Sequence, residues 1–137
     1  MKKLVIVICL CSVACEIEEA TPTVPVNDTF DPTMAQQVSM GMIMGINHTV
    51  SGTATIYLLD GKHTLLLDPF SSQNGPDLKV YLSKDVGATN YLRLGALQST
   101  MGKQSYSIPS GISLSDYPYV HVWCEQFSVE FARAEMK

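Results

Sequence analysis

Two adjacent residues near the C-terminus could carry redox chemistry. Trp123 is the one tryptophan of the 137-residue chain, and Cys124 is the only cysteine beyond residue 15. A cysteine becomes a reactive thiol or a metal ligand where a cationic or hydrogen-bonding neighbourhood favours the thiolate. The charged residues nearest in sequence, Glu125 and Glu130, are anionic and provide no such neighbourhood. Two interpretations therefore stay open: a redox-active thiol, and an inert buried cysteine that packs as a small hydrophobic residue.

The residues before Cys124 alternate as in a β-strand that is buried on one face. Val120, Val122 and Cys124 fall on one side, and His121 and Trp123 fall on the other. The alternation slips by one residue after Cys124, which predicts a tight turn or a bulge. We therefore expect Cys124 to face inward near the end of a sheet. Because His121 lies on the opposite face, the two side chains could bind one metal ion only if a bulge rotated one of them.

A second candidate site lies upstream. Met40, Met42 and Met44 alternate, so a strand would place three thioethers on one face, with His48 further along on the same parity. Thioether and imidazole ligands suit Cu(I). The alternative is that the methionines fill the edge of a core, a common use of this flexible side chain, and that His48 is a hydrogen-bonded histidine at a strand start.

The first 15 residues have the pattern of a secretory leader. Two lysines precede a short apolar run, and the small residues Ser12 and Ala14 lead to Cys15. This order resembles a bacterial lipobox, in which the cysteine becomes lipidated, although the usual lipobox has leucine where this chain has Ser12. We expect cleavage after residue 14 and a lipid anchor on Cys15, with ordinary signal cleavage as the alternative. About 11 apolar residues are too few for a span, which needs about 20.

Charge and cysteine content narrow the function classes. Loss of the two leader lysines leaves seven Lys and Arg against 13 Asp and Glu, a net charge of −6. An acidic protein lacks the basic face that nucleic acid binding requires, so no nucleic acid partner is expected. Two of the four cysteines leave with the leader, so a disulfide framework is not expected.

The remaining chain divides into a tether and one β domain. Residues 15–34 are acidic and proline-rich, which is typical of an extended tether. Residues 35–137 contain short β-type runs separated by turn residues, including an Asp60-Gly61 pair suited to a two-residue hairpin. Seven to eight short strands predict an all-β fold, an antiparallel β-sandwich or a closely related barrel. The expected strands cover residues 49–59, 63–68, 78–83, 91–97, 104–108 and two runs within 119–132.

Two sequence motifs show a resemblance to a known family. They are NGPDLKVYLS at residues 74–83 and VHVWCEQFSVEFARAEM at residues 120–136. Over nearly all of residues 39–137 the chain resembles the DM-thirteen domain family, small extracellular domains often found beside DOMON domains. The resemblance implies an electron-transfer component whose characteristic cysteine is a free thiol or a ligand to a prosthetic group such as haem. Cys124 stands at that position. No DOMON domain accompanies it within these 137 residues, so we expect any haem partner to be another protein.

These observations lead to one functional hypothesis and two alternatives. We expect an anchored lipoprotein of the outer membrane or cell surface that takes part in electron transfer or thiol redox at the cell envelope. Cys124 would be the redox group, Trp123 would pack beside it, and the partner would be an envelope redox or surface protein. The alternatives are a non-catalytic surface module for binding or adhesion, and a copper-binding module. No hydrolase or nucleotide-binding motif is present.

Overall fold

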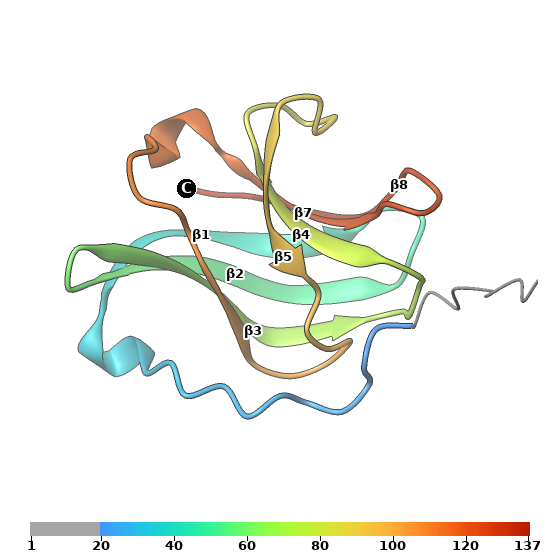
Figure 1. The fold of residues 1–137 in the computed structure, drawn as a ribbon, viewed down its shortest axis with the longest axis horizontal. Helices are drawn as coiled ribbons and strands as arrows, with labels where there is room; N and C mark the ends of the chain where they lie inside the picture. The colour runs from blue at the N-terminus through green and yellow to red at the C-terminus, as the bar shows by residue number, and fades with distance from the viewer. Residues whose placement is uncertain (1–19) are drawn as a thin grey trace, which may run out of the picture.

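The computed structural model describes residues 20–137, and eight antiparallel strands form nearly all of its regular structure (Figure 1). The expected leader and Cys15 lie outside the described residues. The strands follow in one sheet in the order β5-β4-β7-β8-β1-β2-β3-β6. Their bounds are β1 (Gln36–Gly45), β2 (Val50–Leu59), β3 (Lys62–Ser72), β4 (Leu78–Ser83), β5 (Tyr91–Ala96), β6 (Gln104–Ser107), β7 (Tyr119–Cys124) and β8 (Val129–Glu135), with short 3-10 turns at Pro32–Met34 and Leu114–Asp116.

The sheet curls until its two edge strands meet, so the barrel alternative of the predicted fold describes the domain. Strands β5 and β6 come into contact without a hydrogen-bonded ladder. Gln98, just after β5, closes the seam instead. Its side chain donates to the Ser105 carbonyl at 2.6 Å, and its backbone N–H donates to the Tyr106 hydroxyl at 2.9 Å. The predicted all-β antiparallel class is confirmed, and the seam leaves little open edge for other strands to join.

The core follows the alternation of the strands. Leu78, Val80 and Leu82 of β4 are each at most 1 % exposed, as their period of two predicts. On β7 the residues expected to face inward are likewise buried. The predicted hairpin at Asp60-Gly61 joins β2 to β3, and both residues have positive φ angles, 50° and 73°.

Strand β1, the first of the chain, lies between β2 and the last strand, β8. It pairs with β2 along most of its length and with β8 near Met44 and Gly45. Backbone hydrogen bonds in both directions between Met40 and Lys137 extend this contact. Gly41 has no room for a side chain, because a Cβ there would collide with the backbone carbonyl of Glu135. The glycine therefore allows β1 to lie close against the C-terminal segment.

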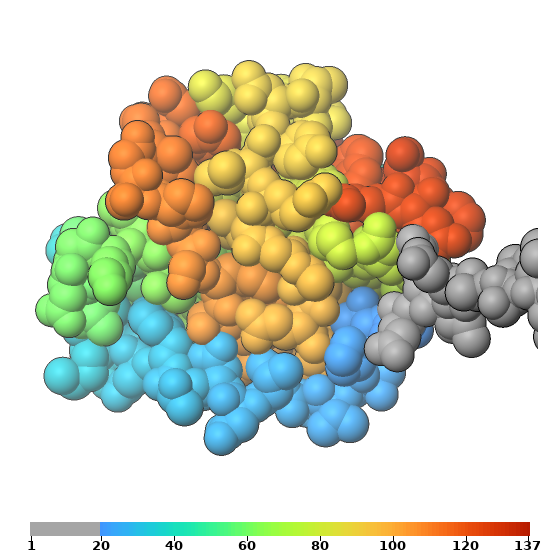
Figure 2. All heavy atoms as spheres, viewed as in Figure 1, coloured from blue at the N-terminus to red at the C-terminus, as the bar shows by residue number. Residues whose placement is uncertain are grey.

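Residues 20–34 differ from the expected free tether, because they lie against the domain. The Asp28 carboxylate accepts hydrogen bonds from the N–H and hydroxyl of Ser105 at 2.7 Å each. Phe30 packs on Tyr57 with ring centroids 5.6 Å apart, and the Thr100 N–H donates to the Pro22 carbonyl. Figure 2 shows this segment, blue to cyan, along the lower rim of the molecule. We call residues 20–34 the strap. Any free tether would begin before residue 20, outside the described residues.

Candidate functional site

Cys124 lies at the end of β7 and faces the core, as predicted. Its side chain is fully buried, and Sγ–H donates to the Pro76 carbonyl at 3.0 Å. Pro76 belongs to the connection between β3 and β4, which covers the sulfur. The strap holds this connection in place, because Ala20 pairs with Pro76 and the Asn74 amide donates to the Thr21 carbonyl at 2.8 Å. The thiol is the donor in this hydrogen bond, because a carbonyl oxygen can only accept.

A haem bound through Cys124 does not fit this arrangement. The sulfur has no exposed surface, and the Pro76 carbonyl occupies the side on which a ligand would approach. The strand partners of Cys124 are Leu78 and Val129, neither of which can coordinate a metal. Among residues 20–137 no group of three or more His, Cys, Asp or Glu side chains could hold a metal ion.

Trp123 points to the outer face of the barrel and belongs to a row of aromatic rings. Its centroid lies 6.1 Å from that of Tyr81 on β4, and Tyr81 stacks on Tyr91 of β5 at 4.2 Å. On the other side His121 is 6.2 Å away, followed by Tyr119 at a further 6.3 Å. We call these five residues the ring row. Tyr91, at one end, is 46 % exposed.

Cross-strand pairing explains why residues 40 positions apart form this row. Strand β4 lies between β5 and β7, with Tyr81 opposite Arg93 on one side and His121 on the other. Neighbouring strands lie about 4.8 Å apart, so rings on the same face come within stacking reach. The sequence placed Trp123 and His121 on this face but provided no register, so it could not reveal Tyr81 and Tyr91 as their neighbours.

An ion pair borders the ring row. Glu125 Oε1 accepts hydrogen bonds from the Tyr81 hydroxyl at 2.5 Å and from Arg93 Nε at 2.7 Å. Burial and then the Glu125 carboxylate raise the pKa of Tyr81 well above its ordinary value. Together with Trp123 and Tyr91 these residues line an open hollow of about 370 Å³. Glu125 is thus engaged on the outer face, opposite the thiol of Cys124.

A buried polar network lies under the β4–β5 connection. His121 is fully buried, its Nδ1 donates to Glu130 Oε1 at 3.0 Å, and Ser83 Oγ lies 2.6 Å from its Nε2. Ser83 Oγ also lies 2.6 Å from the Asp85 carbonyl, and its single proton serves one acceptor at a time. Burial lowers the pKa of His121, and the hydrogen bond and charge of Glu130 oppose this shift only in part.

Ser83, His121 and Glu130 are hydrogen-bonded in the same order as the residues of a hydrolase triad, but a substrate has no access to them. Ser83 is fully buried, so no substrate carbonyl can reach its hydroxyl in this arrangement. The network is therefore structural: it satisfies buried polar groups on the outer face of β4, β7 and β8. Sequence reasoning missed it, because residues 83, 121 and 130 have no motif spacing and meet only through strand register.

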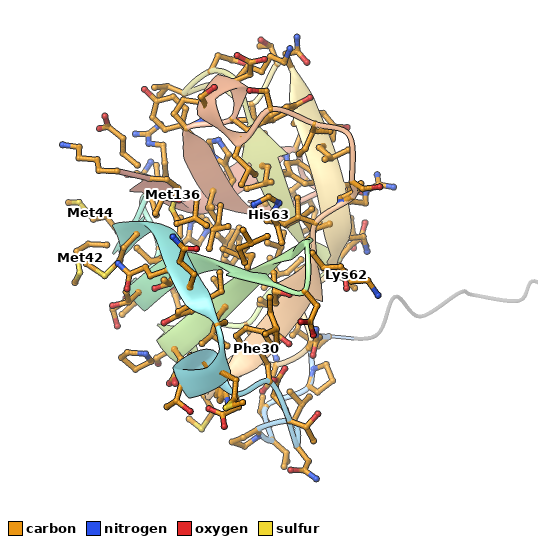
Figure 3. All side chains as sticks on the ribbon, turned by 90° about the vertical axis from the view of Figure 1, so that its left-hand side faces the viewer. Phe30, Met42, Met44, Lys62, His63 and Met136 are labelled. Carbon is orange, nitrogen blue, oxygen red and sulfur yellow. The ribbon has the colours of Figure 1, made fainter. Side chains whose placement is uncertain are left out.

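The methionines do not fill the core edge, so that part of the alternative is wrong, whereas His48 is hydrogen-bonded just before β2, as the alternative expected. Met40, Met42 and Met44 project from the outer face of β1 and are 44, 64 and 68 % exposed. Figure 3 shows Met42 and Met44 on the same side of the strand. His48 is not brought to them. It stacks on Phe131, a buried residue, with centroids 3.7 Å apart, and its Nδ1 donates to the Ile46 carbonyl.

Comparison with known families identifies the domain. Residues 43–136 match the family described as Electron transfer DM13. The chain belongs to this family. The match covers well over half of the DM13 chain and includes Cys124, the whole ring row and β2 to β8, whereas Met40 and Met42 lie before it. The membership expected from the sequence motifs is confirmed, and it supports an electron-transfer role. Neither a curated protein nor a solved structure matches the chain.

Proposed function

We propose that this DM13 domain transfers electrons at the cell envelope, with Cys124 as its redox-active thiol. One observation carries the proposal. Cys124 is buried and cannot touch a partner, but its chain neighbour Trp123 starts a series of stacked rings that leads through Tyr81 to the exposed Tyr91. Conjugated rings in contact couple an electron to the surface better than saturated side chains or water do.

The proposed step balances as follows. The Cys124 thiol loses one electron through Trp123 to a one-electron acceptor protein that docks over Tyr91. The Sγ proton leaves to water when the Pro76 connection opens, and a thiyl radical remains. A reduced donor protein then returns one electron, and water returns the proton. No metal or haem is required at Cys124 for this cycle.

Photo-oxidation tests the route. A flash-generated tris(bipyridine)ruthenium(III) complex serves as the acceptor, and transient absorption follows the Trp123 radical. We expect the radical to live about tenfold longer in Cys124→Ser, equivalent to about 1.4 kcal/mol in the barrier, because the thiol no longer reduces it. Serine keeps a donor for the Pro76 carbonyl, which makes this variant a close structural match.

The controls separate the route from general damage. Trp123→Phe should remove the radical signal. Tyr106→Phe, which alters a buried tyrosine outside the ring row, should leave its lifetime unchanged. Equal lifetimes of the radical in the wild type and in Cys124→Ser would contradict the thiol proposal. That result would favour the surface-binding alternative, with the hollow beside Tyr91 and Trp123 as the binding site.

An optical spectrum of the protein extracted from its native membrane tests the haem alternative. We expect no Soret band, because the surroundings of Cys124 do not fit a haem. A Soret band that disappears in Cys124→Ser would instead assign the cysteine as a haem ligand and overturn the free-thiol proposal.

We further propose that the domain acts as a lipoprotein at the outer membrane or cell surface. The leader pattern and the position of Cys15 support this location. The lipid would hold the barrel next to the membrane, and the redox partner would be another envelope protein. The acidic composition favours a partner with a basic docking surface.

A further inference from the structure

The exposed methionines of β1 are the feature that the proposed function leaves unused. An apolar side chain on a solvent-facing strand is not explained by packing, and here three stand at alternate positions. Met40, Met42 and Met44 all line one open hollow of about 720 Å³ on the outer face of the barrel. Three thioethers around one hollow suggest a binding site for a ligand that prefers sulfur.

The flanking strands leave the thioethers free of competing metal ligands. On the β2 side Met42 and Met44 face Thr53 and Ser51, and the Thr53 hydroxyl donates a long hydrogen bond of 3.8 Å to Met42 Sδ, whose second lone pair is left for a metal ion. On the β8 side Met44 faces Arg133. Neither hydroxyls nor a guanidinium compete with sulfur for a soft ion.

The charged residues that line the hollow, Arg133, Lys137 and Glu135, disfavour a divalent cation. The Arg133 guanidinium is directed to Glu130 at 3.4 Å and to the Val86 carbonyl at 3.2 Å. Glu135 lines the hollow and supplies a negative charge, while Lys137 lines it with a positive one. A single carboxylate is too few oxygen ligands for Ca²⁺ or Mg²⁺, and the sulfur ligands select a soft monovalent cation.

Strand geometry allows neighbouring sulfurs to meet. Alternate residues on a strand lie roughly 6.6 to 6.8 Å apart, and methionine has three rotatable side-chain bonds. The pairs Met40 with Met42 and Met42 with Met44 can each converge on one ion. Met42 belongs to both pairs, so its sulfur is the ligand that every arrangement shares.

We propose that Met42, with Met40 and Met44, forms a Cu(I) site on the outer face of β1. We do not include His48 among the ligands, because it stacks on Phe131 and does not line the hollow. The site is independent of Cys124 and of the proposed electron route. It would give the domain a second function at the envelope, the binding of a soft metal ion.

Competition titration tests the site. The mature protein with Cys124→Ser, in which the Cys124 thiol can no longer bind copper, is titrated anaerobically with Cu(I) against bicinchoninate. We expect one ion per chain with Kd at or below about 1 µM. Met42→Leu should weaken binding by about tenfold or more, a larger loss than for Met40→Leu or Met44→Leu, since leucine keeps the volume but lacks the sulfur.

Matched controls come from methionines outside the hollow. Met34 and Met101 are 71 and 48 % exposed, and Met34→Leu and Met101→Leu should leave the affinity unchanged. Methyl resonances of ¹³C-labelled methionine give the location: Cu(I) should shift the signals of the three β1 methionines and spare those of Met34 and Met101. Binding weaker than micromolar in the parent protein, or equal losses in the control variants, would overturn the proposal.

Discussion

At the residue scale, the face of β7 on which a side chain lies determines the chemistry that is open to it. Cys124 and Trp123 are neighbours in the chain, but one faces the core and the other faces the ring row. The thiol is therefore shielded, and the indole is available for contact with Tyr81. This division suits a buried redox group that exchanges electrons through its neighbour, and it disfavours direct thiol exchange with a partner.

The burial of His121 leads to a prediction about the pH dependence of stability. Burial lowers the pKa of His121 in the folded protein. As the pH falls below the ordinary histidine pKa of about 6.5, the imidazole of the unfolded protein therefore takes up a proton before that of the folded protein does. The stability contribution is therefore fully present above pH 6.5 and is lost as the pH falls from there toward the folded pKa. Urea unfolding at a series of pH values from 5 to 8 should show this decline.

Two variants check the origin of that decline. His121→Gln should lower stability at every pH and flatten the dependence below pH 6.5. His63→Gln changes a histidine outside the buried network and should keep the wild-type slope. A wild-type slope in His121→Gln would show that another group causes the decline.

At the element scale, the strap joins three parts of the barrel that are distant in sequence. It pairs with the Pro76 connection that covers Cys124, bonds to Thr100, and binds β6 through Asp28. Its proline-rich composition suits an extended segment, and its polar contacts hold it to the surface. The strap therefore contributes to the cover over the thiol as well as to stability.

Asp28 is the strap residue whose loss should be easiest to measure. Burial raises the pKa of this carboxyl, but hydrogen bonds from Ser105 and Phe30 outweigh it, and the net pKa is lowered. Asp28→Ala should cost about 1 to 3 kcal/mol of unfolding free energy and speed proteolysis within the strap. Asp28→Asn keeps one acceptor and should cost less. The carboxylate contribution should persist above pH 4 and disappear as the pH falls through the lowered pKa. Unchanged proteolysis in Asp28→Ala would contradict this role.

At the scale of the whole molecule, the nearly closed sheet spaces the two sites along its outer face, and Tyr119 at one end of the ring row also lines the methionine hollow. The ring row lies over β4, β5 and β7, and the methionines lie on β1, with β8 between β7 and β1. A partner protein at Tyr91 and an ion at Met42 therefore need not compete. No helix among residues 20–137 is long and apolar enough to cross a membrane.

Membrane attachment is predicted to depend on one residue. Cys15→Ala should move the protein from the membrane fraction to the soluble fraction and abolish incorporation of a labelled fatty acid. Each buried methylene of an acyl chain contributes about 0.8 kcal/mol, so loss of the lipid removes most of the affinity. Cys124→Ser is the matched control and should stay in the membrane fraction. Persistent membrane association of Cys15→Ala would point to another anchor.

The sequence by itself determined the strand class, the inward position of Cys124 and the family. These follow from local patterns, since a period of two sorts residues to faces and the motifs near residues 74–83 and 120–136 need no tertiary contact. Only the tertiary structure decided that the methionines are exposed, that the strap is bound, and that Tyr81 and Tyr91 extend the row from Trp123. Such facts depend on strand order and register, which bring together residues whose separation in the chain carries no signal.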